Sequence, residues 1–270
     1  MKFWGDKTDL LASNEEWVAW GELDPLFGVA TIRQRAQTGP NPWTDERFYQ
    51  CGASDWDLFC RKWEQYGLRR GTCVEIGCGA GRITTHLARY FHTVHALDVS
   101  PGMLQYARER VPFNVVLHVT GGMEIPLADG SADAIFSTHV LQHFSHFAAT
   151  VAYFREMHRV LAPRGSIMIH VPIIAWPWDS SVGVHKIIHR AKLLLDSWHA
   201  KLGRYALRLR LAKMPPMQVT WYEVSWLYQT LERLDFSDIE IRILFGESEM
   251  AVQHPFIFAT KAVVNHTPSG

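Results

Sequence analysis

A turn with three glycines at alternate positions, followed by an acidic residue, is the part of the sequence whose residue types and spacing indicate chemistry. Gly77, Gly79 and Gly81 come at the end of the β-branched run 72–77 and open a helical stretch. Such a turn needs positive φ and lets a ligand approach where any Cβ would collide. Asp98 stands seventeen positions after Gly81, where a carboxylate at a strand end can accept hydrogen bonds from both hydroxyls of an adenosine ribose. We therefore predict a nucleoside site.

Each of these two features also has an interpretation without a ligand. The glycines could form a tight turn and nothing more, because a glycine-rich motif alone is weak evidence of binding. Asp98 could be a solvated residue that caps the next helix, although Ser100 already offers that cap. The place of the turn between a strand and a helix, with an acid at the end of the following strand, favours the binding site.

The elements that must position these residues follow an alternating pattern from Gly71 onward. Short β-branched runs alternate with helical stretches, which is typical of a parallel sheet with crossover helices. We predict an α/β fold with a doubly wound, seven-stranded, mostly parallel sheet. No helix separates the last two strands, so they should form an antiparallel pair at one edge. The predicted strands are 72–77, 93–98, 114–119, 132–137, 165–171, 238–245 and 255–263, and the predicted helices are 81–91, 101–110, 146–161 and 222–234. A further helix is expected ahead of them, around 56–66.

Four segments of this region together resemble the successive motifs of the class I S-adenosylmethionine-dependent methyltransferases, of the small-molecule methyltransferase-11 and methyltransferase-25 type. They read VEIGCGAGR, ALDVSPGML, DGSADAIFS and HRVLAPRGSIMIHV. The resemblance covers residues 71–172 closely and 222–262 more loosely. It implies a Rossmann-like methyltransferase fold, S-adenosylmethionine as the cofactor, S-adenosylhomocysteine as the product, and no metal.

The resemblance also assigns residues to the cofactor. Glu75 would orient the methionine ammonium group through the turn, the three glycines would line the methionine and ribose, and Asp98 would hold the ribose hydroxyls. Val99 and Met103 would pack on the adenine. The family usually carries an acid after the third strand, and this chain has glycine there. Either Glu124 serves from a shifted register, or the backbone groups of Gly122 and Met123 contact the adenine edge.

The loop after the fourth predicted strand lies where open α/β sheets place ligands. Methyl transfer needs alignment, and it needs a base only when the nucleophile is a poorly acidic hydroxyl. His139 and His143 are the candidates for that base, with a packing role as the alternative for His143. Ser137 is expected to contact the methionine part of the cofactor or the substrate. Tyr49, from a segment that resembles the lid of some family members, is expected near the sulfonium or the carboxylate.

Composition limits the partners that we expect. The 270 residues carry 27 lysines and arginines against 27 aspartates and glutamates, so a globally basic nucleic-acid binder is unlikely. The segment 183–214 is an exception, with eight basic residues against one acidic residue. We expect it to cover the acceptor pocket, where its basic face could contact an acidic substrate, an anionic membrane surface or RNA, or be an ordinary solvated face.

Four units follow from these observations: a helical N-terminal lid over 1–70, a cofactor-binding core over 71–172, a basic helical cap over 173–219, and the C-terminal part of the sheet over 220–270. Asp6 follows the start with no apolar stretch behind it, so the start lacks the layout of a secretory signal. No apolar run reaches the ~20 residues of a membrane span. We predict a cytoplasmic protein, with peripheral membrane contact left open. The cysteines, at 51, 60, 73 and 78, lack the spacing of a zinc site.

We predict methyl transfer to the oxygen or nitrogen of a small or lipid-linked acceptor. An RNA or protein methyltransferase is the alternative within enzymes, although the chain has no NPPY or DPPY tetrapeptide. A cofactor-binding protein without turnover, engaging a membrane or partner through the basic segment, is the alternative outside enzymes. The oligomeric state does not follow from the sequence.

Overall fold

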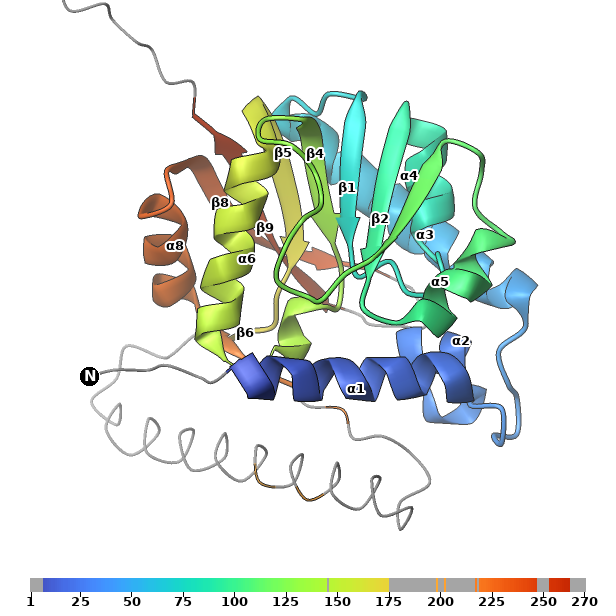
Figure 1. Ribbon diagram of the computed structural model, residues 1–270. Helices are drawn as coiled ribbons and strands as arrows, with labels where there is room; N and C mark the ends of the chain where they lie inside the picture. Colours follow the sequence, from blue (N-terminus) through green and yellow to red (C-terminus); the bar gives the residue numbers. More distant parts are fainter. Residues whose placement is uncertain are drawn as a thin grey trace, which may run out of the picture.

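The computed structural model describes residues 7–144, 146–174, 198, 202, 217, 219–246 and 253–262. Within them, seven strands form one sheet in the order β3-β2-β1-β4-β5-β9-β8 (Figure 1). The first five strands are mutually parallel, and β9 runs antiparallel to both of its neighbours. This is the predicted doubly wound sheet with an antiparallel pair at one edge. The strands are β1 (Thr72–Ile76), β2 (Thr93–Asp98), β3 (Val115–Val119), β4 (Ala132–Ser137), β5 (Leu161–His170), β8 (Phe236–Phe245) and β9 (Gln253–Lys261).

Helices cover both faces of the sheet (Figure 1). One face packs against α6 (Phe147–Val160) and α8 (Val224–Glu232) through Phe154 and Leu227. The other packs against α3 (Asp45–Trp63), α4 (Thr84–Tyr90) and α5 (Pro101–Arg108). Because both faces are buried, successive strand residues are apolar on either side, as is usual for parallel strands. In β1, for example, Cys73 faces the second layer of helices and Val74 faces the first.

The helix α1 (Lys7–Leu23) lies across the rim of the sheet at which β1 and β2 end (Figure 1). It packs with α2 (Pro25–Val29) and the start of α5 in a third apolar cluster that includes Trp20, Phe27 and Met103. The N-terminal segment is therefore ordered against the core through its aromatic residues. Its position at the carboxyl ends of the strands is where open α/β sheets bind ligands.

The three largest departures from the sequence-based assignment concern a helix, a strand and a second sheet. The helix expected around 56–66 begins eleven residues earlier, because Thr44 caps α3 by accepting a hydrogen bond from the amide of Arg47. The strand β5 begins at Leu161, ahead of the expected start at 165. A small second sheet was not expected; it consists of β6 (Ile173–Ile174) and β7 (Tyr222–Glu223).

The predicted basic cap over 173–219 falls almost entirely outside the described residues, and so does the segment 183–214 that we expect to contact an acceptor or a membrane. Their roles stay predictions. Among the helices that the structure does describe, none is long and apolar enough to cross a membrane.

Gly52 allows α3 to lie close to the backbone of Arg82, in the segment that follows β1. A Cβ there would lie 2.4 Å from the backbone oxygen of Arg82 and 2.8 Å from its Cγ. We expect Gly52→Ala to lower the free energy of unfolding by about 1–3 kcal/mol, although alanine normally stabilises a helix interior by roughly 0.5–1 kcal/mol relative to glycine. Urea unfolding measures the change. The exposed Ser54→Ala on the same helix is the control, and equal effects in the two variants would contradict the close approach.

Candidate functional site

The turn between β1 and α4 contains three glycines in left-handed backbone. The φ angle is 72° at Gly77, 53° at Gly79 and 84° at Gly81, a region that favours glycine. A Cβ at Gly77 would lie 2.1 Å from a methyl group of Val140, and one at Gly79 would lie 2.4 Å from a methyl group of Val29. Glycine is therefore required at both positions for the turn to pass between these two side chains.

Asp98 ends β2 beside this turn, with both carboxylate oxygens oriented by backbone amides. The amide of Gly79 donates to Oδ2 at 2.8 Å and the amide of Ser100 donates to Oδ1 at 2.9 Å. Burial raises the pKa of the Asp98 carboxyl, and these hydrogen bonds oppose that shift. The Ser100 hydroxyl separately caps α5 by accepting from the amide of Met103. Asp98 is thus not needed as the helix cap, and each of its oxygens keeps a further lone pair for a ligand.

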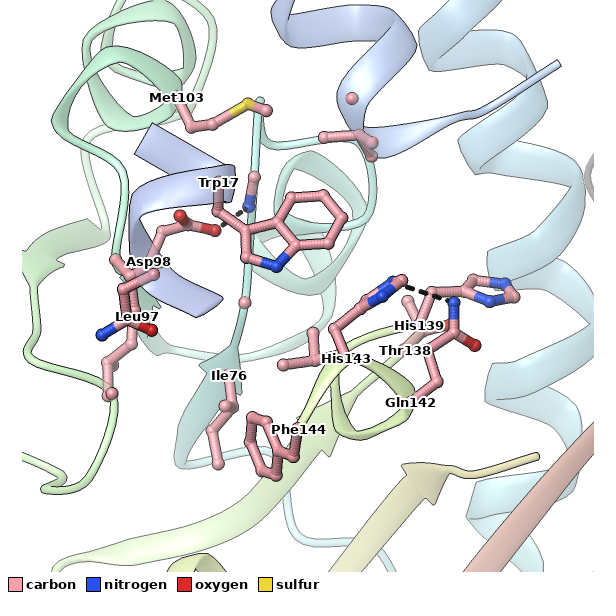
Figure 2. Close-up of a pocket in the computed structure, with 18 of the residues that line it drawn as sticks. Trp17, Ile76, Leu97, Asp98, Met103, Thr138, His139, Gln142, His143 and Phe144 are labelled. Carbon is pink, nitrogen blue, oxygen red and sulfur yellow. Dashed lines mark hydrogen bonds between the residues drawn. The ribbon is translucent and has the colours of Figure 1, made fainter. Parts of the chain in front are cut away.

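A cavity of about 280 Å³ opens at this end of the sheet, close to the lower end of the ~300–1,000 Å³ range of small-molecule sites. Figure 2 shows Asp98 and Met103 on one side of it, His139 and His143 on the other, and the indole of Trp17 between them. The structure thus brings the predicted ribose-binding acid and the predicted bases to one cavity. The predicted site residues that line it are Gly77, Gly79, Asp98, Val99, Met103, Gly122, His139 and His143.

Two residues of α1, Asn14 and Trp17, complete the wall of this cavity. They are three positions apart and so share one face of the helix. The amide of Asn14 donates to the backbone oxygen of Gly121 at 2.9 Å, and the Trp17 ring lies 4.5 Å from the ring of His143 between centroids. Neither residue was predicted from the sequence to line the site. Their i, i+3 spacing on a helix ahead of the core was the available signal.

The loop after β3, where the resemblance implies an acid at the adenine, reaches the cavity through other residues. Thr120 and Gly122 line the cavity, and Gly122 has a φ of 81°. Met123 and Glu124 are not among the lining residues, and Glu124 is exposed. In this structure the Glu124 side chain is exposed to solvent, which does not support the shifted-register role, and that role stays a prediction. Contact through the backbone of Gly122 remains the prediction here.

Four further predicted site residues support the turn from outside the cavity. The Thr84 hydroxyl donates to the Glu75 carboxylate at 2.5 Å, the Ser137 hydroxyl donates to the backbone oxygen of Ile76 at 3.0 Å, and the Tyr49 hydroxyl donates to that of Ala80 at 2.7 Å. Gly81 faces Ala107 and Val111. The structure thus does not bring Tyr49, Glu75, Gly81 or Ser137 to the cavity wall. Their predicted roles at the cofactor stay predictions. In this structure the hydrogen bonds of Tyr49, Glu75 and Ser137 hold the turn in place.

The two predicted bases differ in their surroundings. His139 follows β4 in left-handed backbone, with a φ of 58°. Burial lowers its pKa to about 3, with a smaller contribution from the charge of Arg82. A general base works best with a pKa near the working pH, so His139 is poorly suited to that role. His143 lies at the end of a short 3-10 turn, Leu141–His143, and the amide nitrogen of Gln142 lies 3.0 Å from its Nε2. An amide nitrogen can only donate, which makes this Nε2 an acceptor.

Comparison with known proteins identifies the central part of the chain. The family model described as "Methyltransferase domain" matches residues 74–169. The malonyl-[acyl-carrier protein] O-methyltransferase of Hahella chejuensis is 30% identical over 132 residues, which cover 44% of this chain and 46% of that protein. The mouse protein named "Probable tRNA methyltransferase 9B" is 34% identical over 100 residues, covering 36% of this chain and 21% of that protein. The chain thus spans less than half the length of either relative.

Solved structures share the fold at low sequence identity. The 1,6-didemethyltoxoflavin-N1-methyltransferase of Burkholderia thailandensis, solved with its substrate and S-adenosylhomocysteine, superposes with a TM-score of 0.59 at 15% identity. The match covers 97% of this chain and 93% of that chain. At this identity the similarity establishes the architecture of the chain, and the chemistry must be argued from the site itself.

Proposed function

We propose that this chain, which contains a domain of the class I S-adenosylmethionine-dependent methyltransferases, transfers a methyl group to the oxygen or nitrogen of a small or lipid-linked acceptor. The observation that carries the proposal is the single cavity that joins Asp98 and the glycine turn to His139 and His143. One wall has the groups that suit a nucleoside, and the opposite wall has groups that suit a reacting nucleophile.

The residues present fit the methyl donor. Asp98 presents a fixed carboxylate to a ribose diol, because its two oxygens are held by the amides of Gly79 and Ser100. The turn leaves no room for side chains at Gly77 and Gly79, so its backbone can face the ligand directly. Trp17 stands between the two walls, and an aromatic face favours a sulfonium cation. The bound donor supplies an electrophilic methyl group with a neutral leaving sulfide.

The chain's own contribution to the reaction is alignment and exclusion of water. The leaving group needs no proton, so no general acid is required. Where the acceptor is a hydroxyl, His143 is the residue placed to receive its proton, because it lines the cavity beside Trp17. Its Nε2 carries the lone pair that would take the proton, in exchange for the hydrogen bond from the Gln142 amide. Asn14 and Trp17 of α1 form part of the cavity wall, and this helix limits the access of water from that side.

The acceptor class is supported by the nature of the relatives. One similar protein is named for the methylation of a carrier-linked acid on oxygen, and a structural neighbour is named for methylation of a small heterocycle on nitrogen. A tRNA acceptor is the second candidate, favoured by the similarity to the mouse protein. Parallel assays with small carboxylic and heterocyclic acceptors and with unfractionated tRNA distinguish the two.

The donor site is tested with Asp98→Ala and isothermal titration with S-adenosylhomocysteine. Loss of a hydrogen-bonded carboxylate costs about 1.5–3 kcal/mol, so we expect binding roughly 10- to 150-fold weaker. Glu124→Ala is the matched control, because Glu124 is an exposed acid away from the cavity wall. Parent-like affinity in a folded Asp98→Ala protein would exclude the ribose contact, and with it the proposed site.

A further inference from the structure

Three histidines that are far apart in the sequence converge beside the cavity. We propose that His139, His170 and His254 bind a divalent transition-metal ion of the kind that prefers imidazole ligands. Each histidine offers one ring nitrogen, and these three nitrogens all lie within 4.8 Å of one another. The ring centroids of His139 and His170 are 4.2 Å apart, and that of His254 is 5.8 Å and 6.0 Å from theirs.

The topology of the sheet produces this convergence. His139 follows β4 and His170 ends β5, and these two strands are parallel neighbours. His254 stands at the start of β9, which pairs antiparallel with β5 and places Phe256 opposite His170. Two strand ends and one strand start thus meet at the same rim. No short sequence motif could show this, because each histidine comes from a different strand.

Two ring nitrogens of this cluster are buried without a hydrogen-bond partner among the described residues. The side chain of His170 is 4% exposed and that of His254 is 0% exposed. Nε2 of His139 and Nδ1 of His170 are buried with no hydrogen-bond partner in the described part of the chain. A buried polar atom without a partner costs about 1–3 kcal/mol. A metal ion shared by the three rings would satisfy these atoms together.

The ligand set and its surroundings decide which metal fits. The cluster holds imidazoles and no carboxylate, which suits zinc, cobalt, iron or nickel and disfavours magnesium, a cation that takes oxygen ligands. Arg82, whose charge acts on His139, is paired with buried Asp55. Phe59 and Phe256 pack on the ring of His254. Zinc–nitrogen distances of about 2.0–2.1 Å place tetrahedral ligand atoms about 3.4 Å apart, so binding requires the rings to turn toward one another.

The cluster meets the proposed reaction site through one residue. His139 belongs to the three histidines and also lines the cavity. Three protein ligands with an open position toward a cavity are typical of catalytic sites. If the proposed function holds, an acceptor hydroxyl bound there would lose its proton to His143 more readily. Its oxygen lone pair then forms the C–O bond as the C–S bond breaks, and that electron pair stays on sulfur. Metal binding itself does not depend on this role.

The test is titration of chelator-treated, full-length protein with Co²⁺, followed by visible absorption, and with Zn²⁺ in competition. We expect one strongly bound equivalent with d–d bands. His254→Phe keeps an aromatic ring among its aromatic neighbours while it removes a ligand, and His139→Gln changes the ligand that faces the cavity. Each should weaken this binding by more than 100-fold, beyond the roughly 10–100-fold effect of changes outside the ligand shell.

The matched control is His118→Ala. Nδ1 of His95 and Nε2 of His118 lie 3.0 Å apart on neighbouring strands, so this pair is an alternative site for a metal, without a third histidine. The proposal is supported if this variant keeps the strong equivalent. It is overturned if the parent binds none, or if both cluster variants bind like the parent. S-adenosylhomocysteine titration of the same samples separates the two proposals: donor binding without metal binding removes only the metal site.

Discussion

Asp55→Leu is expected to lower the free energy of unfolding by about 3–5 kcal/mol, because it leaves a buried guanidinium without its partner. The carboxylate of Asp55 pairs with Nη1 of Arg82, and the side chains are 2% and 3% exposed. Nε of Arg82 has no partner in the described part of the chain, so Asp55 supplies the charge compensation. Urea unfolding of the two proteins at one pH measures the difference.

Two controls separate the buried charge from the loss of a contact. Asp55→Leu combined with Arg82→Met removes both charges, and replacement of a buried pair by apolar residues is often neutral, so the double variant should be more stable than the single one. Glu64→Ala breaks the exposed pair with Arg70 and should cost at most about 1 kcal/mol. A single variant that behaves like Glu64→Ala would mean that water reaches the guanidinium.

Glu75→Gln is expected to stabilise the protein at neutral and alkaline pH. Glu75 is buried under the glycine turn, and burial raises its pKa to about 7 from 4.5, against the lowering effects of the Thr84 hydroxyl and of Arg82. A difference of one pKa unit between the folded and unfolded chain corresponds to about 1.4 kcal/mol. Ionisation of Glu75 therefore lowers the free energy of unfolding by about 3 kcal/mol. Glutamine keeps the shape and still accepts the hydrogen bond from Thr84 without the charge.

The sign follows from the order of the two pKa values. Below about pH 4.5 the Glu75 carboxyl is neutral in both the folded and the unfolded chain, and it contributes no difference. Between pH 4.5 and 7 the unfolded chain ionises first, so stability falls as the pH rises. Above about pH 7 the cost is constant. The gain from Glu75→Gln should therefore grow from pH 5 to 7 and then level off.

Unfolding free energies of parent and variant between pH 5 and 8.5 test this profile. Glu156→Gln is the opposite case, because the hydrogen bonds of Arg159 lower the pKa of Glu156. That variant should lose stability above the ordinary carboxyl pKa. If Glu75→Gln is instead the less stable protein at pH 8, the carboxylate at position 75 is stabilised by its surroundings despite its burial.

The core of the fold was predictable because its signals are local. Short, mostly apolar runs such as 93–98 and 132–137 match β2 and β4 at both ends. The start of α3 was missed because its first turns carry mostly polar residues, and only Thr44 marks the boundary through its capping hydrogen bond. The added residues of β5 lie around Pro163 and Gly165, which read as the end of a helix and the start of a loop.

The candidate site was predictable only where its residues are close in the sequence, because only local signals can be read from one chain. Asp98 and the glycine turn belong to one strand–turn–helix unit, so their relation is fixed over a short stretch of chain. Tyr49 is predicted near the sulfonium from resemblance, and in this structure its hydroxyl donates to the backbone oxygen of Ala80. Trp17 is an aromatic residue of the N-terminal region that lines the cavity. Its place depends on how α1 docks on the finished core, and no local pattern encodes that docking.

The reversed direction of β9 changes which residues the seventh strand can offer to the site. In a fully parallel sheet, the first residues of this nine-residue strand would stand about 30 Å from the rim where β5 ends, at roughly 3.3 Å per residue. Because the strand runs the other way, His254 arrives at that rim beside His170. The antiparallel strand β9, next to the edge of the sheet, thereby adds a histidine from the C-terminal part of the chain to those that follow the parallel strands.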